Sequence, residues 1–106
     1  VLGVAYKNDI DDYRESPALE VMEHLQKQGA EASFFDPHIS EYRHKGKGYT
    51  GLAELTEQAL READIVIICT AHAAVDYEFV QKHANAVFDT RNATRNVADK
   101  AKIELL

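Results

Sequence analysis

The stretch IVIICT, residues 65–70, decides the fold class of this chain. Its first five residues are all apolar, and a short, continuous apolar run is typical of a strand that is buried on both faces. Strands of that kind occur in parallel sheets that helices cover on both sides. The neighbouring segments are therefore expected either to pair with this strand or to pack against it.

Strand-like and helix-like segments alternate along the rest of the chain. Strands are predicted at residues 1–5, 31–36, 86–90 and 102–106, helices at 17–28, 52–64 and 77–84, and an irregular stretch at 38–51. The first helix has a good N-cap in Ser16 and a suitable first residue in Pro17. The alternation indicates an α/β fold, a three-layer, Rossmann-like open parallel sheet with helices on both faces. Right-handed crossovers then predict the strand order 2-1-3-4.

Length and composition exclude several classes of function. At 106 residues the chain is expected to form one domain, residues 1–106. A net charge of −6 without a basic stripe argues against a nucleic-acid partner. No apolar run reaches the length of about 18 residues that spans a membrane. A single cysteine cannot form an internal disulfide, so a cytoplasmic location is expected. The chain opens inside a strand without methionine, and we expect it to be a fragment of a longer protein.

Polar side chains follow three of the predicted strands where each strand ends. Tyr6 and Lys7 follow the first strand, Thr70 and His72 the third, and Arg91 the fourth. The carboxyl ends of parallel strands share one edge, and ligands bind there at the point where the strand order reverses. A lysine ammonium at this edge suits a phosphate. It could equally pair with an acidic residue of its own loop, at position 9, 11 or 12, and the sequence leaves both interpretations open.

Other residues near this edge are expected to have structural roles. Arg14 can hold a carboxylate of its loop in a two-pronged contact, which would fix the loop that carries Lys7. His72 is expected to support its loop, and Cys69 to be a small buried hydrophobe. The histidines show no metal-ligand spacing. No carboxylate pair or Ser/His/Asp set is recognisable either, so we expect neither a metal site nor a catalytic residue in this chain.

The loop after the first strand lacks the G-x-G-x-x-G fingerprint of dinucleotide-binding folds. Only Gly3 precedes Tyr6, so the close approach of backbone to a pyrophosphate is not provided. We therefore expect this sheet to bind something other than NAD.

Three motifs resemble those of one known family. The opening residues 1–38 contain the pattern G-x-x-[YF]-K-x-x-x-x-D-x-R-E-S-P and resemble the start of the C-terminal, UDP-binding domain of the UDP-glucose/GDP-mannose dehydrogenase family. ADIVIICTAH at 63–72 and VFDTRNAT at 87–94 resemble the two later motifs of that domain, in the same order. The variant DTRNAT is more similar to the branch that oxidises UDP-N-acetylhexosamines. The expected substrate is therefore UDP-N-acetylglucosamine or UDP-N-acetylmannosamine, with UDP-glucose as the alternative.

The resemblance implies a role for the chain and for three of its residues. The full enzymes are NAD-dependent UDP-sugar 6-dehydrogenases of polysaccharide biosynthesis, which oxidise the C6 alcohol of the sugar to a carboxylate. Tyr6 and Lys7 match the aromatic-lysine pair at the nucleotide-sugar site, and Arg91 matches the arginine of the D-[GT]-R motif that contacts the substrate. The family's catalytic residues and NAD-binding glycines lie in other parts of the enzyme. The resemblance thus implies an inactive fragment, with NAD bound elsewhere and a homodimer or higher assembly at full length.

Two interpretations from other classes remain at this point. A receiver-like α/β module without a sugar ligand would use the acidic cluster DIDDYRE, residues 9–15, although the third strand ends without a phospho-accepting aspartate. A stand-alone dehydrogenase would need the dinucleotide fingerprint that the first loop lacks.

Overall fold

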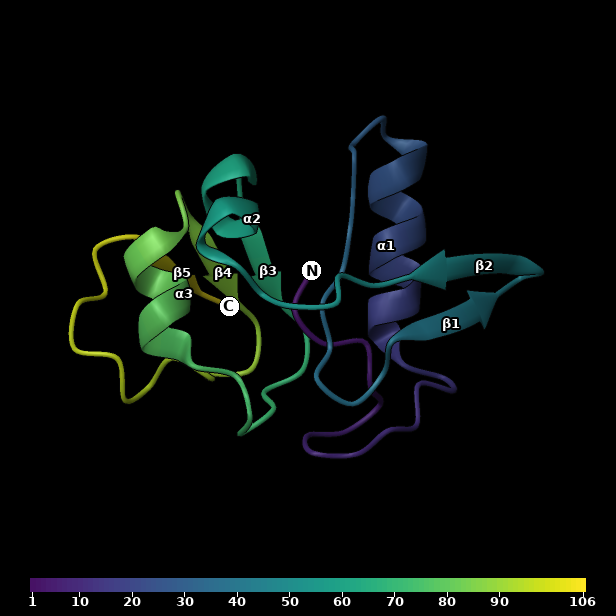
Figure 1. Ribbon diagram of the computed structural model, residues 1–106, viewed down its shortest axis with the longest axis horizontal. Helices are drawn as coiled ribbons and strands as arrows, with labels where there is room; N and C mark the ends of the chain where they lie inside the picture. Colours follow the sequence, from purple (N-terminus) through teal and green to yellow (C-terminus); the bar gives the residue numbers. More distant parts are fainter.

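The computed structural model describes all residues, 1–106, and contains one parallel sheet (Figure 1). Its regular strands are β3 (Val66–Ile68), β4 (Val87–Asp89) and β5 (Ile103–Leu105), hydrogen-bonded in the order β3-β4-β5. Two extended segments continue the sheet beyond β3, because Leu2 forms parallel bridges both to Ile68 and to Phe35. The spatial order is therefore residues around 35, residues around 2, β3, β4 and β5. This confirms the predicted order 2-1-3-4, although the first two segments pair through single bridges and are not full strands.

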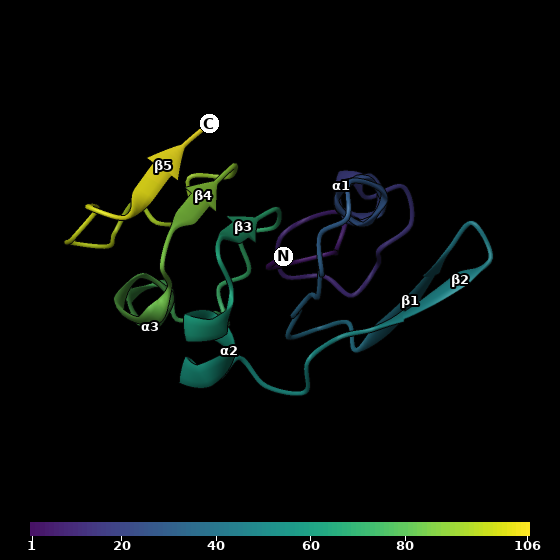
Figure 2. The ribbon, with the colours of Figure 1, turned by 90° about the horizontal axis from the view of Figure 1, so that it is seen from above.

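Helices lie on both sides of this sheet, as predicted. Figure 2 shows α1 (Pro17–Lys27) on one side and both α2 (Glu57–Glu62) and α3 (Tyr77–His83) on the other. The Ser16 side chain accepts a hydrogen bond from the Ala18 N–H and caps α1, with Pro17 as its first residue. Asp76 caps α3 in the same way through the Phe79 N–H. No helix in the structure has both the length and the apolar character needed to cross a membrane.

Gly3 divides the hydrophobic core into two parts. In a regular strand, residues two apart face the same side of the sheet. Here Leu2 packs with the residues of α2 and α3, whereas Val4 packs with those of α1. The backbone of Gly3 has φ +85°, which redirects the chain between these two residues. A Cβ atom at Gly3 would lie 2.5 Å from Cβ of Thr70, so this close approach also requires glycine.

The prediction of an irregular stretch at residues 38–51 is wrong. β1 (Glu41–His44) and β2 (Lys47–Thr50) form an antiparallel hairpin beside α1. Both turn residues, Lys45 and Gly46, have positive φ, as a two-residue hairpin turn requires. Tyr42 and Tyr49 are paired across the strands and their rings are stacked, with centroids 4.7 Å apart. The sequence feature that could have predicted this hairpin is the Lys45-Gly46 pair between two segments that each contain a tyrosine.

Two further predictions need correction. The helix expected at 52–64 begins only at Glu57, because the Thr56 side chain caps it and the Leu52 N–H is bonded to the Phe34 carbonyl instead. The stretch at 65–70 is not buried on both faces throughout. Ile65 is 49% exposed, and Ile67 is half-buried, because α1 covers the neighbouring part of the sheet.

Candidate functional site

Three loops meet at the carboxyl-terminal edge of the sheet, where a ligand site was predicted. In Figure 1 the loop of residues 6–15 and the loop that follows β3 both lie at the lower edge of the molecule. The side chain of Asn8 accepts a hydrogen bond from the Ala71 N–H at 2.8 Å, and the Asp9 carboxylate accepts one from the Ala73 N–H at 2.7 Å. The loop after β4 reaches the same edge because β4 is parallel to β3.

Tyr6 and Lys7 stand at the start of the first of these loops. The Tyr6 N–H donates to the Asp12 carbonyl at 2.7 Å, and the residue is 47% exposed. Lys7 is also exposed, and its ammonium forms no ion pair with any acidic residue of the chain. Of the two interpretations that the sequence left open for Lys7, pairing within its own loop is therefore absent from the structure.

Arg14 forms the predicted two-pronged contact, and its partner is Asp12. Its Nε donates to Oδ1 at 3.0 Å and its Nη2 to Oδ2 at 2.9 Å. These hydrogen bonds lower the pKa of Asp12 to about 2. Both side chains are exposed, so water screens the pair and its role is to shape the loop. Asp12 is thereby engaged with Arg14 and not with Lys7.

Arg91 is held at the edge by a buried aspartate that precedes it. One oxygen of Asp89 accepts the N–H groups of Arg91 and Ala93, and the other accepts the N–H and the hydroxyl of Thr94. Burial alone raises the pKa of Asp89, but these hydrogen bonds bring it below its ordinary value. The backbone around Arg91 is thus fixed while its side chain remains exposed. Sequence reasoning missed this role of Asp89, although an Asp at a strand end is a common turn signal.

Arg91 also lies near Cys69, at the end of the neighbouring strand. Burial raises the pKa of the Cys69 thiol, and the Val1 amine and the Arg91 guanidinium oppose this rise. A half-buried thiol with a raised pKa is a poor nucleophile. Cys69 packs against the core on the α1 side, in agreement with the small-hydrophobe interpretation, although it is not fully buried.

A second buried carboxylate, Asp36, joins three chain segments behind the edge. Its Oδ2 accepts hydrogen bonds from the N–H groups of Val4 and Ala5 and lies 2.8 Å from Nε2 of His72. Its Oδ1 accepts the His38 N–H at 2.8 Å. Burial alone raises the pKa of Asp36, but the hydrogen bonds outweigh it and the pKa is lowered. The predicted loop-supporting role of His72 is confirmed, whereas Asp36 was interpreted only as the end of a strand.

Two clusters bring together side chains that can ligate metals, although their sequence spacing shows no such pattern. They are Asp9 with His38 and His72, and Glu20 with Glu23 and His44. In the first cluster both ring nitrogens of His72 are already hydrogen-bonded. In the second cluster, the ammonium groups of Lys27 and Lys45 already contact the Glu23 carboxylate. Neither cluster offers a free set of ligands.

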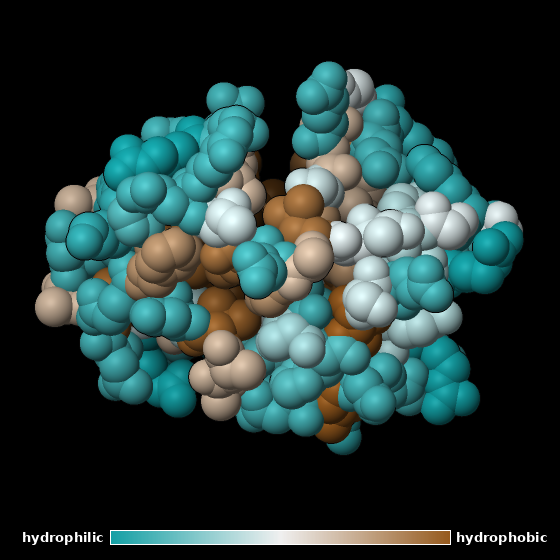
Figure 3. All heavy atoms as spheres, viewed as in Figure 1, coloured by the Kyte–Doolittle hydropathy of each residue, from teal (hydrophilic) through white to brown (hydrophobic).

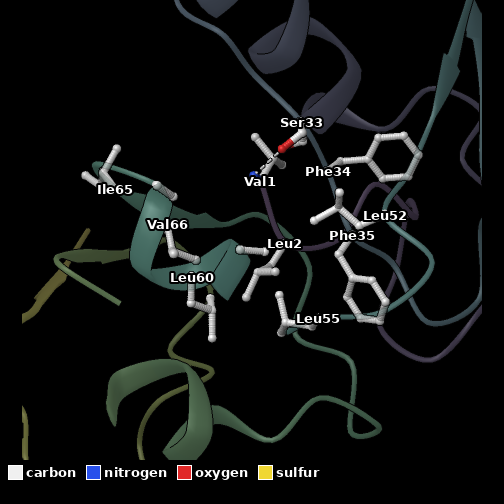
Figure 4. A pocket seen from close by; sticks show the side chains of 12 residues that line it. Val1, Leu2, Ser33, Phe34, Phe35, Leu52, Leu55, Leu60, Ile65 and Val66 are labelled. Carbon is white, nitrogen blue, oxygen red and sulfur yellow. Dashed lines mark hydrogen bonds between the residues drawn. The ribbon is translucent and has the colours of Figure 1, made fainter. Parts of the chain in front are cut away.

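An apolar pocket lies at the other end of the strands. Figure 4 shows Leu2, Phe35 and Leu60 among its walls, and the Val1 amine donates to the Ser33 carbonyl at 2.9 Å beside it. Eleven of its 12 lining residues are hydrophobic, and its volume is about 50 Å³. Hydrophobic side chains also gather at the surface where residues 51–56 cross between β2 and α2 (Figure 3). A pocket this small and apolar does not suit a charged nucleotide.

The carboxyl-terminal edge, in contrast, can hold an anion. It offers two exposed cationic side chains, Lys7 and Arg91, on loops whose backbones are fixed by buried carboxylates. An ammonium or guanidinium without a protein partner is available for charge-assisted hydrogen bonds to phosphate. No ion pair or hydrogen bond to a protein group engages either side chain, so both are available at this edge.

Comparison with known proteins identifies relatives over most of the chain. The family described as UDP-glucose/GDP-mannose dehydrogenase family, UDP binding domain, matches residues 1–96. The UDP-N-acetyl-D-mannosamine dehydrogenase of Escherichia coli (strain K12) is 39% identical over 72 residues, which cover 67% of this chain and 17% of that protein. The protein of the same name from Methanococcus maripaludis (strain C7) is 31% identical over 117 residues, which cover 100% of this chain and 26% of that protein.

Solved structures match nearly the whole chain as well. The UDP-D-ManNAc dehydrogenase of Pyrococcus horikoshii matches 98% of this chain and 24% of that chain, with a TM-score of 0.70 and 27% identity. The dehydrogenase Cap5O of Staphylococcus aureus, at 24% identity and a TM-score of 0.71, shares the fold. The chain spans only 17% to 26% of the length of the two curated relatives.

Proposed function

Because this chain belongs to the UDP-glucose/GDP-mannose dehydrogenase family, as its UDP binding domain, we propose that it binds the UDP part of a nucleotide sugar through Tyr6, Lys7 and Arg91. The observation that carries this proposal is that the side chains of Lys7 and Arg91 form no ion pair with acidic residues of the chain. Lys7 has no acidic partner, and Arg91 extends from a loop that Asp89 fixes. The two residues follow parallel segments at the same edge of the sheet.

Each of the three residues has a chemical task in this proposal. The Lys7 ammonium is a compact charge for the diphosphate, and the Arg91 guanidinium can bind two oxygens at once. The exposed ring of Tyr6 offers an apolar face with a polar tip beside them. Because the edge is an open surface in this chain, the rest of the enzyme would complete the site.

We further propose that the whole protein is an NAD-dependent UDP-sugar 6-dehydrogenase, most similar in substrate to its relatives that are named UDP-N-acetyl-D-mannosamine dehydrogenase. This domain would hold the UDP and so place the C6 alcohol at catalytic groups outside the chain. Binding energy from a remote part of a substrate is used in this way to orient the reacting carbon. A homodimer or higher assembly and a cytoplasmic location, which suits the free Cys69, belong to the same proposal.

The residues of this chain do not fit NAD itself. When bound to the enzyme, NAD accepts the hydride from the sugar alcohol. A dinucleotide fold brings glycine backbone against the pyrophosphate. Here the open side of Gly3 is filled by Thr70, so that glycine serves packing within the sheet. We therefore propose that NAD binds outside residues 1–106.

Titration calorimetry of the full-length enzyme with UDP tests the site. Losing one charge-assisted contact should weaken binding by about 1.5–3 kcal/mol in Lys7→Ala and in Arg91→Ala, or roughly 10- to 150-fold in Kd. Lys82→Ala and Arg95→Ala are the matched controls, since they remove exposed cations from α3 and from the end of the Arg91 loop. Unchanged affinity in both site variants would rule out the proposed residues.

A further inference from the structure

The loop that carries Lys7 is held in a strained shape by two contacts of Asp9. Asp9 has φ +64°, in the left-handed region that residues other than glycine rarely adopt. Its N–H donates to Nδ1 of His72 at 2.8 Å, and its carboxylate accepts the Ala73 N–H at 2.7 Å. A residue in such a conformation persists only where its surroundings impose it, and strain of this kind gathers at functional sites.

His72 is the buried anchor for this shape, and its hydrogen bonds define its tautomer. Nδ1 accepts the Asp9 N–H, so this nitrogen carries no proton and Nε2 is the N–H that donates to Asp36. The His72 ring is fully buried, its backbone carbonyl accepts the Tyr77 hydroxyl, and the ring lies edge-on to that of His38. Asp36 is in turn fixed by the N–H groups of Val4 and Ala5, directly before Tyr6.

These contacts form a chain from the core to the exposed loop: Asp36, then His72, then Asp9. Asp9 lies two residues after Lys7, whose own side chain has no contact that would fix it. A flexible lysine is useful at a diphosphate only if its backbone is held in place. The free ammonium of Lys7 and the strained backbone of Asp9 are therefore parts of one local structure.

We propose that Asp9 and His72 are positioning residues, which act through the loop of residues 6–15 to hold Lys7 where it meets the diphosphate. The inference rests on the proposed function and adds to it the residues that organise the site. Neither residue needs to touch the nucleotide. If the loop adopts its binding shape for only a tenth of the time, the apparent Kd rises about tenfold.

Asp9→Ala removes the hydrogen bond to the Ala73 N–H, which helps to hold the backbone of residue 9 at φ +64°. Alanine at this φ has no side-chain contact that offsets the conformational cost. UDP binding by the full-length enzyme should weaken about tenfold. Asp9→Asn is the matched variant, because asparagine tolerates this φ and its amide oxygen can still accept the Ala73 N–H. It should restore most of the affinity that alanine loses. The Asp9 side chain is 55% exposed, so both variants are expected to fold.

A double-mutant cycle with Lys7→Ala separates positioning from a general structural effect. If Asp9 acts through Lys7, then Asp9→Ala should have little further effect on UDP affinity once Lys7 is alanine. Additive losses would overturn the inference, and so would unchanged affinity in Asp9→Ala alone. An unmodified enzyme that does not bind UDP would overturn the proposed function together with this inference. Normal UDP binding that survives Asp9→Ala would overturn this inference alone.

His72 variants give a second, independent measurement. In His72→Gln the amide nitrogen can replace Nε2 and donate to Asp36, but the acceptor for the Asp9 N–H is lost. In His72→Asn the amide oxygen can replace Nδ1 as that acceptor, while Asp36 loses the one side-chain donor among its partners. The Gln variant should therefore lose more UDP affinity than the Asn variant, and the Asn variant should have the lower melting temperature. The opposite order of affinities would overturn the proposal.

Discussion

Replacing Gly3 by alanine should destabilise the chain far more than the same change at Gly29. Both glycines have strongly positive φ, +85° at Gly3 and +91° at Gly29. A Cβ at Gly29 would meet nothing within 4 Å. At Gly3 it would lie 2.5 Å from Cβ of Thr70 and 2.9 Å from the backbone N and O of that residue. The two positions therefore share the conformational cost and differ in the steric one.

The magnitude follows from these two costs. A left-handed conformation costs a residue other than glycine about 1–2 kcal/mol, which applies at both positions. Overpacking adds about 1–3 kcal/mol at Gly3 alone. Thr70 cannot easily move, because its hydroxyl donates to the Ala5 carbonyl at 2.8 Å and its N–H to the Leu2 carbonyl at 3.3 Å. Gly3→Ala should thus lose about 2–5 kcal/mol of a total of about 5–15 kcal/mol.

Equilibrium urea unfolding of the 106-residue chain measures the difference. With a urea dependence of about 1–3 kcal/mol per molar, the unfolding midpoint of Gly3→Ala should fall by roughly 1 M or more, and that of Gly29→Ala by clearly less. If the two variants lose the same free energy of unfolding within error, Thr70 moves aside for the added Cβ atom. Gly3 is then not held against a rigid neighbour, and the expected steric cost is refuted.

Three further outcomes are expected, each from a buried polar contact. Asp36→Ala leaves without acceptors the N–H groups that donate hydrogen bonds to this carboxylate, and should lower the free energy of unfolding, measured in urea, by at least about 3 kcal/mol. Asp36→Asn can keep the bonds made by Oδ2 and should lose less; equal losses would contradict this. The folded pKa values of Asp36 and Asp89 lie below their ordinary values. The stability that these carboxylates contribute should therefore be fully present above about pH 4 and fall as acid protonates them. Melting temperatures measured from about pH 7 to about pH 3 would show this fall, and a flat series would contradict the assignment. Ser16→Ala removes the cap of α1 and should lower stability by about 1–2 kcal/mol, measured by loss of helical circular dichroism in urea, and no change would show that the cap is dispensable.

Some features of this protein follow from residues that are close in the sequence. The start of α1 depends on Ser16 and Pro17, and the start of α3 depends on Asp76, whose side chain bonds an N–H only three residues away. The strand-helix alternation predicted the three layers and the order of the parallel segments, because right-handed crossovers leave few alternatives. The same topology predicted that Lys7 and Arg91 follow strands at one edge.

The sequence was less informative where contacts between residues distant in the sequence override the local pattern. Leu52 and Leu55 continue a helical pattern, yet the Leu52 N–H bonds to Phe34 and the helix begins only after Thr56. The β1–β2 hairpin was missed because glycines and basic residues at 43–48 indicated a loop, whereas the tyrosine pair that stabilises it becomes evident only across the strands.

The sequence by itself determined the α/β class, the order of the segments and the placement of Lys7 and Arg91 after strands that end at one edge of the sheet, since these depend on hydrophobic periodicity, caps and chain direction. Only the tertiary structure decided how that edge is organised. The bonds of Asp36 to Val4 and to His72 join residues 32 and 36 positions apart, and the bond from Asp9 to His72 spans 63. No local pattern encodes such pairs. They form because folding buries these polar groups together, and a buried donor or acceptor without a partner is too costly to retain.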